Sequence, residues 1–342
     1  MPDTSDQIPP SRLITRRLDA LGSEAARAVA VAARLVRGGA LVAFPTETVY
    51  GLGADAGNPA AVAAVYGAKG RPSFNPLIAH VADTAEAARL GKMSDAAERL
   101  AKAFWPGPLT LILECRDPAA VCDLARAGLG SVAVRVPSHP VARAFLRAAQ
   151  CPVVGPSANR SGHVSPTEAD HVIADLDGRI DAVLDAGSTP VGVESTIVSC
   201  LGSDPVLLRP GGIARADIAR VLGRPVGDAP ATDALHPLAP GALASHYAPR
   251  ARVRLEAKRV EPGEALLTFA GFMPPGTEYA VEVFDLSPEG NLEQAAARLY
   301  GALRHLDALA VVGIAVVPLP RSGLGEAIAD RLRRAAAPRP GA

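Results

Sequence analysis

Hydrophobic and polar positions repeat with helical and strand-like periods along most of the chain. Apolar residues recur with the helical period after Ser23 and as far as Arg37, where two glycines follow. Serine is a favoured N-cap and glycine a favoured helix terminator, so this pattern predicts a helix that Ser23 caps. The run ALVAFP (40–45) then predicts a buried strand that ends at Pro45, because proline cannot donate to a sheet ladder.

The same periods predict alternating strands and helices up to residue 200. A short helix is expected over 59–68, and the Ala-rich stretch 84–104 predicts one or two more. Strands are expected at 77–81, 109–114, 131–137, 151–159, 181–187 and 195–200, the fourth opening into a loop. Since the elements alternate without strict βαβ regularity, we expect an α/β sandwich on a mixed sheet.

The composition changes between residues 225 and 249, which are rich in Pro, Gly and Ala and have little periodicity. This segment predicts a linker or lid between a larger domain over 12–224 and a C-terminal domain over 250–338. Residues 1–12 are polar with paired prolines, and we expect them to be disordered.

The C-terminal domain has the pattern of a small parallel α/β fold of Rossmann-like type. Strands are expected at 252–257, 264–271, 279–286 and 309–320, and a second amphipathic helix at 323–336. Between the last two strands, Ser287 predicts the cap of a helix with one apolar stripe. That stripe consists of Leu292, Leu299, Leu303 and Leu306.

Composition narrows the class of protein. Hydrophobic residues make up 49% of the 342 residues, aromatic residues 4%, and the formal net charge is zero. This predicts a globular protein with an aliphatic core and no basic tail, although a local basic cleft stays open. The start lacks the apolar core of a signal peptide, and the longest apolar run, 308–317, is shorter than the roughly 20 residues of a membrane-spanning helix. None of the four cysteines forms a C-x-x-C pair, so we expect free thiols in a cytoplasmic protein without a membrane partner.

The common catalytic and cofactor-binding motifs are absent from the sequence or matched only in part. The chain has no P-loop pattern and no G-x-S-x-G, and its seven histidines lack metal-ligand spacing. Three GLG stretches, at 51–56, 128–133 and 323–328, match a dinucleotide fingerprint only in part. The residues therefore predict neither a covalent nucleophile nor a metal site made by the protein alone.

Four polar segments are harder to explain as core. They are PTETVYGLG (45–53), KGRPSFNPLIAH (69–80), GPSANRSGHVSPT (155–167) and GVESTIV with LLRPGG (192–198 and 207–212). Polar side chains at strand ends face the ligand crevice in open α/β sheets, and loops held by Gly and Pro make anion cradles. Taken singly, each segment is also compatible with a plain turn, a solvated charge pair or an ordinary polar loop.

Together the four segments indicate one kind of chemistry. Lys69, Arg71 and Arg209 suit phosphate oxygens, and Arg135, on a valine-rich strand, suits a carboxylate. This set predicts nucleotidyl transfer between two bound substrates, catalysed by positioning and charge stabilisation. Magnesium would arrive on the triphosphate.

These segments and GSVAVRVPSHP (130–140) resemble the YrdC-type family, whose K-x-R and S-x-N signatures are here Lys69/Arg71 and Ser157/Asn159. The HYAP of the linker and the final GLGEAIADRLRRAA resemble the long, two-domain form, the threonylcarbamoyl-AMP synthases. The resemblance runs from about Ser11 to Ala336. It implies a YrdC-like twisted sandwich as the catalytic domain.

The resemblance also implies a reaction and a set of site residues. L-Threonine, bicarbonate and ATP would give threonylcarbamoyl-AMP and pyrophosphate, and a downstream tRNA threonylcarbamoyl transferase would use the product to modify tRNA. Lys69 and Arg71 would be catalytic. Threonine would be held by Thr46, His80, Arg135, Ser157 and Ser195. ATP would be held by Lys69, Arg71, Asn75, Ser131, Asn159, Ser165, Thr167, Arg209 and Tyr247.

One segment departs from the family pattern, and two alternatives stay open. The linker reads LASHY (243–247) where some relatives have a basic KYRHY-like sequence, so no cationic phosphate contact is expected there, while Tyr247 remains as a lid residue.

One alternative is a related carbamoyl-adenylate enzyme of hydrogenase maturation, although such enzymes bring zinc fingers and this chain has no C-x-x-C. The other is a module that contacts tRNA or double-stranded RNA, against which the neutral charge weighs.

Overall fold

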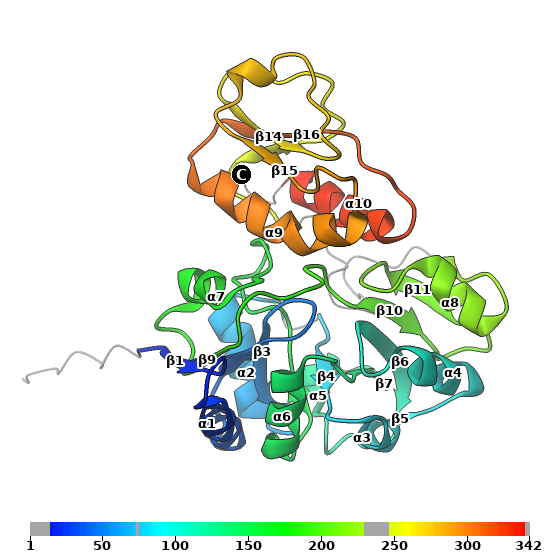
Figure 1. Cartoon of the computed structure of the whole chain (residues 1–342). Coiled ribbons are helices and arrows are strands. Elements are labelled where there is room, and N and C mark those ends of the chain that lie inside the picture. Colours follow the sequence, from blue (N-terminus) through cyan, green and yellow to red (C-terminus); the bar gives the residue numbers. More distant parts are fainter. Residues whose placement is uncertain (1–13, 73–74, 229–245, 339–342) are drawn as a thin grey trace, which may run out of the picture.

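The computed structural model describes residues 14–72, 75–228 and 246–338. The expected disordered segment 1–12 and most of the expected linker lie outside the described residues. Figure 1 shows a larger N-terminal part and a smaller C-terminal part, with two helices of the smaller part lying between its own sheet and the larger part. None of the helices within the described ranges is long and apolar enough to cross a membrane.

The larger part is built on one mixed sheet of twelve strands. The strand order is β1-β9-β2-β3-β8-β4-β7-β6-β10-β11-β12, and β5 pairs with β6. The strands are β1 (Arg16–Asp19), β2 (Val42–Phe44), β3 (Gly51–Asp55), β4 (Ile78–His80), β5 (Gly91–Lys92), β6 (Leu109–Cys115), β7 (Ser131–Arg135), β8 (Val153–Val154), β9 (Ala182–Asp185), β10 (Thr196–Ser199), β11 (Val206–Arg209) and β12 (Gly227–Asp228). Parallel pairs such as β4 with β7 stand beside antiparallel pairs such as β6 with β7. The predicted mixed α/β sheet is confirmed.

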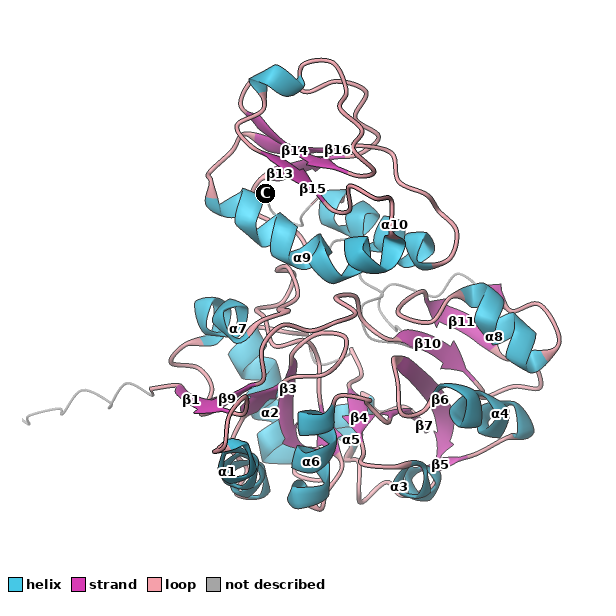
Figure 2. Ribbon diagram, viewed as in Figure 1, coloured by secondary structure: helices cyan, strands magenta, loops and turns pink. Residues whose placement is uncertain are grey.

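Helices cover both faces of this sheet, as Figure 2 shows. They are α1 (Ala25–Arg37), α2 (Pro59–Lys69), α3 (Thr84–Leu90), α4 (Asp95–Phe104), α5 (Asp123–Arg126), α6 (Pro140–Ala149), α7 (Ala169–Leu176) and α8 (Arg215–Leu222). Side chains alternate across a strand, so Val42 and Phe44 of β2 pack with α1 and α6, while Ala43 faces the larger core on the other side. The aliphatic, Ala-rich composition is what allows such close packing on both faces.

The C-terminal part contains a four-stranded parallel sheet in the order β13-β16-β14-β15. Its elements are β13 (Arg252–Arg254), β14 (Glu264–Thr268), a 3₁₀ turn η1 (Thr277–Tyr279), β15 (Val283–Asp285), α9 (Leu292–Ala308), β16 (Gly313–Val316) and α10 (Leu324–Ala336). The predicted small parallel α/β domain is confirmed. Three of the four leucines of the predicted stripe, Leu299, Leu303 and Leu306, are fully buried.

Local details differ from the sequence prediction at helix starts. Ser23 is not the cap of α1, because the helix begins after Glu24, which makes no side-chain capping bond. Ser287 is not the cap of α9 either. Asn291 takes that place, and its side chain accepts from the amides of Glu293 and Gln294, whereas Ser287 accepts from the Asn291 amide one turn earlier. Asparagine and serine cap equally well, so propensity alone could not choose between them.

Two further segments, 84–104 and 51–56, form elements that the sequence left open or did not predict. The stretch 84–104 forms two helices, α3 and α4, separated by the short strand β5. The partial fingerprint GLGADA forms strand β3, which the sequence did not predict, rather than a dinucleotide loop. Its glycines lie against Phe44, where a Cβ on Gly53 would come within 3.0 Å of the ring and within 2.8 Å of the Val42 carbonyl oxygen.

The C-terminal part is seated on the larger part through α9 and α10. Gly192 has a φ of +74°, and a Cβ there would lie 2.3 Å from the Ala296 carbonyl oxygen of α9. Only glycine permits this approach of two backbones. At one edge of the contact Arg215 pairs with Glu326 at 2.6 Å, and at another Arg304 pairs with Asp175 at 3.0 Å.

Candidate active site

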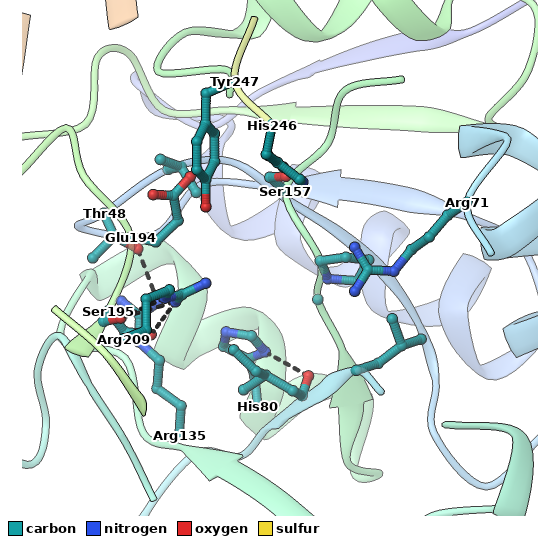
Figure 3. A pocket seen from close by; sticks show the side chains of 15 residues that line it. Thr48, Arg71, His80, Arg135, Ser157, Glu194, Ser195, Arg209, His246 and Tyr247 are labelled. Carbon is teal, nitrogen blue, oxygen red and sulfur yellow. Dashed lines mark hydrogen bonds between the residues drawn. The ribbon is translucent and has the colours of Figure 1, made fainter. Parts of the chain in front are cut away.

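A pocket opens where the polar ends of several strands meet the C-terminal end of the expected linker, and Figure 3 shows its side chains. It is lined by Thr48, Val49, Arg71, Leu77, Ile78, His80, Arg135, Gly155, Pro156, Ser157, Glu194, Ser195, Arg209, His246 and Tyr247. Sheet register explains the gathering. His80 and Arg135 are paired neighbours on parallel strands, and antiparallel pairing brings the end of β11, at Arg209, to the start of β10 beside Ser195.

The pocket brings together residues that the sequence analysis predicted from separate motifs. Seven of them line it: Arg71, His80, Arg135, Ser157, Ser195, Arg209 and Tyr247. They come from every one of the polar segments except 45–53, together with strand β7 and the end of the linker. Segment 45–53 contributes Thr48 and Val49 instead. The roles of the individual residues stay predictions.

Lys69 joins the K-x-R and S-x-N motifs directly. It ends helix α2, and Gly70 in the left-handed conformation turns the chain toward Arg71. The Lys69 ammonium donates to the carbonyl oxygens of Ser157 and Asn159, and the side chain is almost fully buried. Lys69 does not itself line the pocket, but it holds the loop that does.

Arg135 is held firmly at the other end of the pocket. Its Nη2 forms an ion pair with Glu47 Oε1 at 2.7 Å, its Nη1 donates to Thr48 Oγ1 at 2.8 Å, and its Nε donates to the Gly107 carbonyl at 3.4 Å. Both members of the ion pair are buried. The predicted carboxylate-binding arginine therefore already has one carboxylate partner from the chain.

Arg209 and Ser195 form a second arginine site. The guanidinium donates to the Ser195 carbonyl at 2.8 Å and to Ser195 Oγ at 3.2 Å. Ser195 Oγ also shares a hydrogen bond with Thr110 Oγ1 at 2.7 Å. A Cβ on Gly211 would lie 2.3 Å from the Glu194 carbonyl oxygen, so the glycines after Arg209 let its strand end pack against the VEST segment.

Polar atoms without partners occur at Arg71, which lines the pocket, and at Asn75 and Asn159, which belong to the same motifs but are not among the lining residues. Arg71 Nη2 donates to the Pro76 carbonyl at 3.3 Å, but its Nε has no hydrogen-bond partner among the described residues. Asn75 is fully buried, and within the described part of the chain neither its amide oxygen nor its amide nitrogen is bonded. The same holds for Asn159 Oδ1. Buried polar groups are normally bonded, so this group of atoms indicates the place of a polar ligand.

Burial lowers the pKa values of the basic side chains around the pocket. It lowers the pKa of Lys69 well below its ordinary value, with the nearby Arg71 charge adding to the effect, and it lowers the pKa of Arg71 to about 10. It also lowers the pKa of His80 and of His246 to about 3, so both imidazoles are neutral at physiological pH. The site therefore presents cations that lack full solvation, together with neutral histidines, which favours an anionic ligand.

Tyr247 enters the pocket from the C-terminal end of the expected linker, residues 225–249. Its backbone has a φ of +62°, a conformation that is uncommon for a residue with a side chain. Packing holds it there, since its ring stacks on Tyr300 with centroids 5.6 Å apart and touches His246 with centroids 4.1 Å apart. A bulky residue kept in an unfavourable backbone conformation at a pocket points to a functional reason for its placement.

Besides Lys69, Asn75 and Asn159, four predicted site residues are not among those that line the pocket. Thr46 Oγ1 closes the turn at residues 46–49 by donating to the Val49 carbonyl. Ser131 begins β7, whose other end carries Arg135. Ser165 donates to Glu194 Oε1 at 2.6 Å, and Thr167 bonds His171 Nδ1 at 3.3 Å. Ser165 and Thr46 thus support residues that line the pocket, and contact of any of the four with a substrate stays a prediction.

Three polar lining residues were missing from the predicted set: Thr48, Glu194 and His246. Thr48 and Glu194 lie within the motifs PTETVYGLG and VESTIV, so attention to every polar position of those motifs would have found them. Glu194 also accepts hydrogen bonds from Tyr300 and Arg331 of the C-terminal domain. No feature of the sequence indicated that contact.

The carboxylates of the pocket region are already engaged, Glu47 by Arg135 and Glu194 by Arg331. Across the described ranges, no cluster of three or more His, Cys, Asp or Glu residues could hold a metal ion. The arrangement is suited to binding anions by arginine and lysine, and to positioning two polar substrates beside each other.

Comparison with known proteins gives consistent matches over both domains. The Sua5/YciO/YrdC family model, described as telomere recombination, matches residues 34–211, and a model for the threonylcarbamoyl-AMP synthase C-terminal domain matches residues 213–337. A threonylcarbamoyl-AMP synthase of Bacillus subtilis is 44% identical over 321 residues, which are 90% of this chain and 92% of that protein. One of Pyrococcus abyssi is 41% identical over 327 residues, 90% of this chain and 93% of that protein. The crystal structure of P. abyssi Sua5 complexed with L-threonine has a TM-score of 0.84 at 37% identity, covering 94% of this chain and 98% of that one.

Proposed function

The chain belongs to the family of two-domain, Sua5-type threonylcarbamoyl-AMP synthases, and we propose that it catalyses the reaction of that family in the pocket described above. L-Threonine, bicarbonate and ATP are converted to threonylcarbamoyl-AMP and pyrophosphate. The observation that carries this proposal is the convergence of three arginines, the buried Arg135 and Arg209 and the partly exposed Arg71, with a neutral histidine on one pocket.

The two ends of the pocket suit different substrates. Threonine carries a carboxylate that matches the planar fork of Arg135, and His80 and Ser195 lie beside it. ATP carries several negative charges that match Arg71 and Arg209, and the unbonded amide of Asn75 offers both a donor and an acceptor to the nucleotide. The crystal structure of P. abyssi Sua5 with L-threonine supports the presence of a threonine site in this fold.

The chain's own residues would act by position and charge. The amine of threonine takes up bicarbonate-derived CO₂ to form a carbamate, and a carbamate oxygen attacks the α-phosphate of ATP as pyrophosphate leaves. Arg71, Arg209 and Lys69 would stabilise the charge that develops on the phosphates, an effect that a water-poor site makes stronger. Tyr247 and His246 would exclude water from the short-lived carbamate.

Magnesium would come with the triphosphate. Among the described residues, the carboxylate that lines the pocket, Glu194, and the nearby Glu47 are both paired with arginine. The residues therefore fit an ion that is bound through phosphate oxygens and water, which is how magnesium commonly binds. When bound, it would neutralise phosphate charge.

The product would pass to a downstream tRNA threonylcarbamoyl transferase, since a mixed carbamate–phosphate anhydride is an activated acyl donor. The four cysteines are free thiols, which supports a reducing, cytoplasmic compartment. The matches to threonylcarbamoyl-AMP synthases over nine-tenths of the chain favour this function over a hydrogenase-maturation enzyme.

The test is release of pyrophosphate from ATP by the purified full chain. We expect release that requires both threonine and bicarbonate, with threonylcarbamoyl-AMP identified by mass spectrometry. Serine and valine serve as matched controls, because each keeps only one of the two groups on the threonine β-carbon. Pyrophosphate release that is independent of threonine would contradict the proposal.

A further inference from the structure

The C-terminal domain reaches into the pocket of the other domain at Glu194. Arg331 Nε of α10 donates to Glu194 Oε2 at 2.6 Å, and the Tyr300 hydroxyl of α9 donates to the same oxygen at 2.8 Å. Glu194 lines the pocket and directly precedes Ser195, to which Arg209 is bonded. One side of the candidate active site is thus held by side chains from the other domain.

Arg331 also contacts the residue that enters from the linker. Its guanidinium carbon lies 5.3 Å from the centroid of the Tyr247 ring, within the range of a cation–π contact. The neighbouring His246 amide donates to the Arg334 carbonyl of the same helix at 3.2 Å. A single side chain of α10 therefore touches both the pocket carboxylate and the aromatic lid residue.

Stability alone does not explain a charged residue at this position. Arg331 is completely buried, and its Nη2 has no hydrogen-bond partner in the described part of the chain. Replacing a buried ion pair by apolar residues of similar size is often neutral or stabilising, so a buried pair is weak evidence for a purely structural role. The domain contact already has a half-exposed ion pair, Arg215 with Glu326, that lies outside the pocket.

Arg331 compensates the negative charge of the Glu194 carboxylate. Although burial opposes it, the Arg331 and Arg209 charges lower the pKa of the Glu194 carboxyl to about 2, so the group is an anion beside a site for a polyanion. If Arg331 were neutral, Arg209 would be the cation among the described residues that acts most on Glu194. The carboxylate would then repel the nucleotide and compete with it for Arg209.

We propose that Arg331 is a positioning residue of the reaction: it neutralises Glu194 and fixes Tyr247, so that Arg209 stays directed at ATP. The C-terminal domain thereby completes the nucleotide side of the site. This inference rests on the proposed function for the identity of the nucleotide. Its test uses the binding of ATP, which can be measured without turnover.

The experiment compares the full chain with Arg331→Met, Arg331→Lys and the double variant Arg331→Met/Glu194→Gln. Affinities for ATP and for threonine are measured separately by calorimetry, alongside thermal unfolding and pyrophosphate release. For Arg331→Met we expect ATP to bind about tenfold more weakly, roughly the effect of one partly screened charge. Threonine, a zwitterion without net charge, should change by less than about twofold. Arg331→Lys keeps the charge and should stay within about threefold of the parent for ATP.

The double variant should recover most of the lost ATP affinity, because Glu194→Gln removes the uncompensated charge. Glu326→Gln is the matched control: it removes the ion pair at the edge of the domain contact and should lower the unfolding temperature without changing ATP affinity. If Arg331→Met does not fold, Arg331→Gln replaces it with the same tenfold expectation.

Three results would overturn the inference. They are an ATP affinity within twofold of the parent in Arg331→Met, an equal loss of ATP and threonine affinity, or no recovery in the double variant. Failure of the parent chain to release pyrophosphate with threonine would instead contradict the proposed function, and the comparison of ATP affinities would still stand.

Discussion

The two ends of the pocket differ in how completely their polar atoms are bonded. At one end two guanidinium nitrogens of Arg135 donate hydrogen bonds, to Thr48 and Gly107, and the third forms an ion pair with Glu47 without a hydrogen bond to any described residue. At the other end Arg71 Nε and both polar atoms of Asn75 have no partner among the described residues. A ligand at the Arg135 end must add to or replace existing bonds, whereas a ligand at the Arg71 end supplies bonds that the chain leaves unmade.

This difference bears on what each residue contributes to folding and to binding. A bonded side chain such as Arg135 serves both, and its loss leaves Glu47 buried without a counter-charge. An unbonded one such as Asn75 costs stability in the free chain and is compensated only by a ligand. Variants at the two ends should therefore separate stability from activity in different ways.

The largest effect is expected for Lys69→Ala, which acts on the loop between the two ends. It removes a buried charge and leaves the Ser157 and Asn159 carbonyls without their donor. We expect the rate of pyrophosphate release to fall on the order of 10²–10³, the usual cost of one well-placed charge donor, in a protein that remains folded. Lys102→Ala, an exposed lysine in α4, is the control. Unchanged turnover in a folded Lys69→Ala protein would refute the assignment.

Next in size is Arg135→Lys, at the bonded end. The lysine ammonium keeps the charge but lacks the planar, forked guanidinium. It therefore cannot contact Glu47, Thr48 and a substrate carboxylate at the same time. We expect the KM for threonine to rise about 10- to 100-fold and the unfolding temperature to fall, while the KM for ATP changes little. Steady-state kinetics and thermal unfolding check this, with the exposed Arg147→Lys as control. Equal changes in both KM values would show that the two ends are not independent.

A smaller effect is expected for Asn75→Ala, at the unbonded end. Here the KM for ATP should change and the stability should not, whereas Arg135→Lys should change the KM for threonine and the stability. The free chain loses two buried groups that lack partners, so its unfolding free energy should change by less than about 1 kcal/mol, while the KM for ATP rises about five- to tenfold. Asn159→Ala is the matched comparison. Its Nδ2 donates to the Arg160 and His163 carbonyls, so that change should cost about 1–3 kcal/mol of stability. Similar destabilisation by both changes would mean that Asn75 is bonded in the free protein.

The smallest expected effect is the uptake of a fraction of a proton when ATP binds. Burial lowers the pKa of Lys69 in the free chain, and a bound polyanion raises it, so the complex holds more protons than the free protein at any pH between those two values. ATP binding above about pH 8, where the nucleotide itself no longer titrates, should take up a fraction of a proton. Calorimetry in buffers of different ionisation enthalpy measures this, with adenosine as the uncharged control. Proton release on ATP binding would contradict the sign.

The sequence predicted the parts of the site that depend on strand ends, because motifs at strand ends converge once strands pair. Arg135, Ser195 and Arg209 were found in this way, whereas His80 was expected only from the resemblance to the YrdC-type family. It did not predict that Glu47 pairs with Arg135 or that Glu194 pairs with Arg331, since these partners lie far apart in the chain and each charge had several possible partners. The caps of α1 and α9 were missed for a related reason, as neighbouring polar residues compete for one position.

The contact at Gly192 has a consequence for how the two domains can vary. Because the loop at residue 192 meets the backbone of α9 with no room for one methyl group, the spacing of the domains is set by main chain and not by adjustable side chains. A methyl group introduced there would act as a wedge, tilting α9 and drawing Tyr300 away from Glu194. The contact at Gly192 therefore has no room for one additional carbon atom, and we expect a Gly192→Ala exchange to displace α9 in the neighbouring domain.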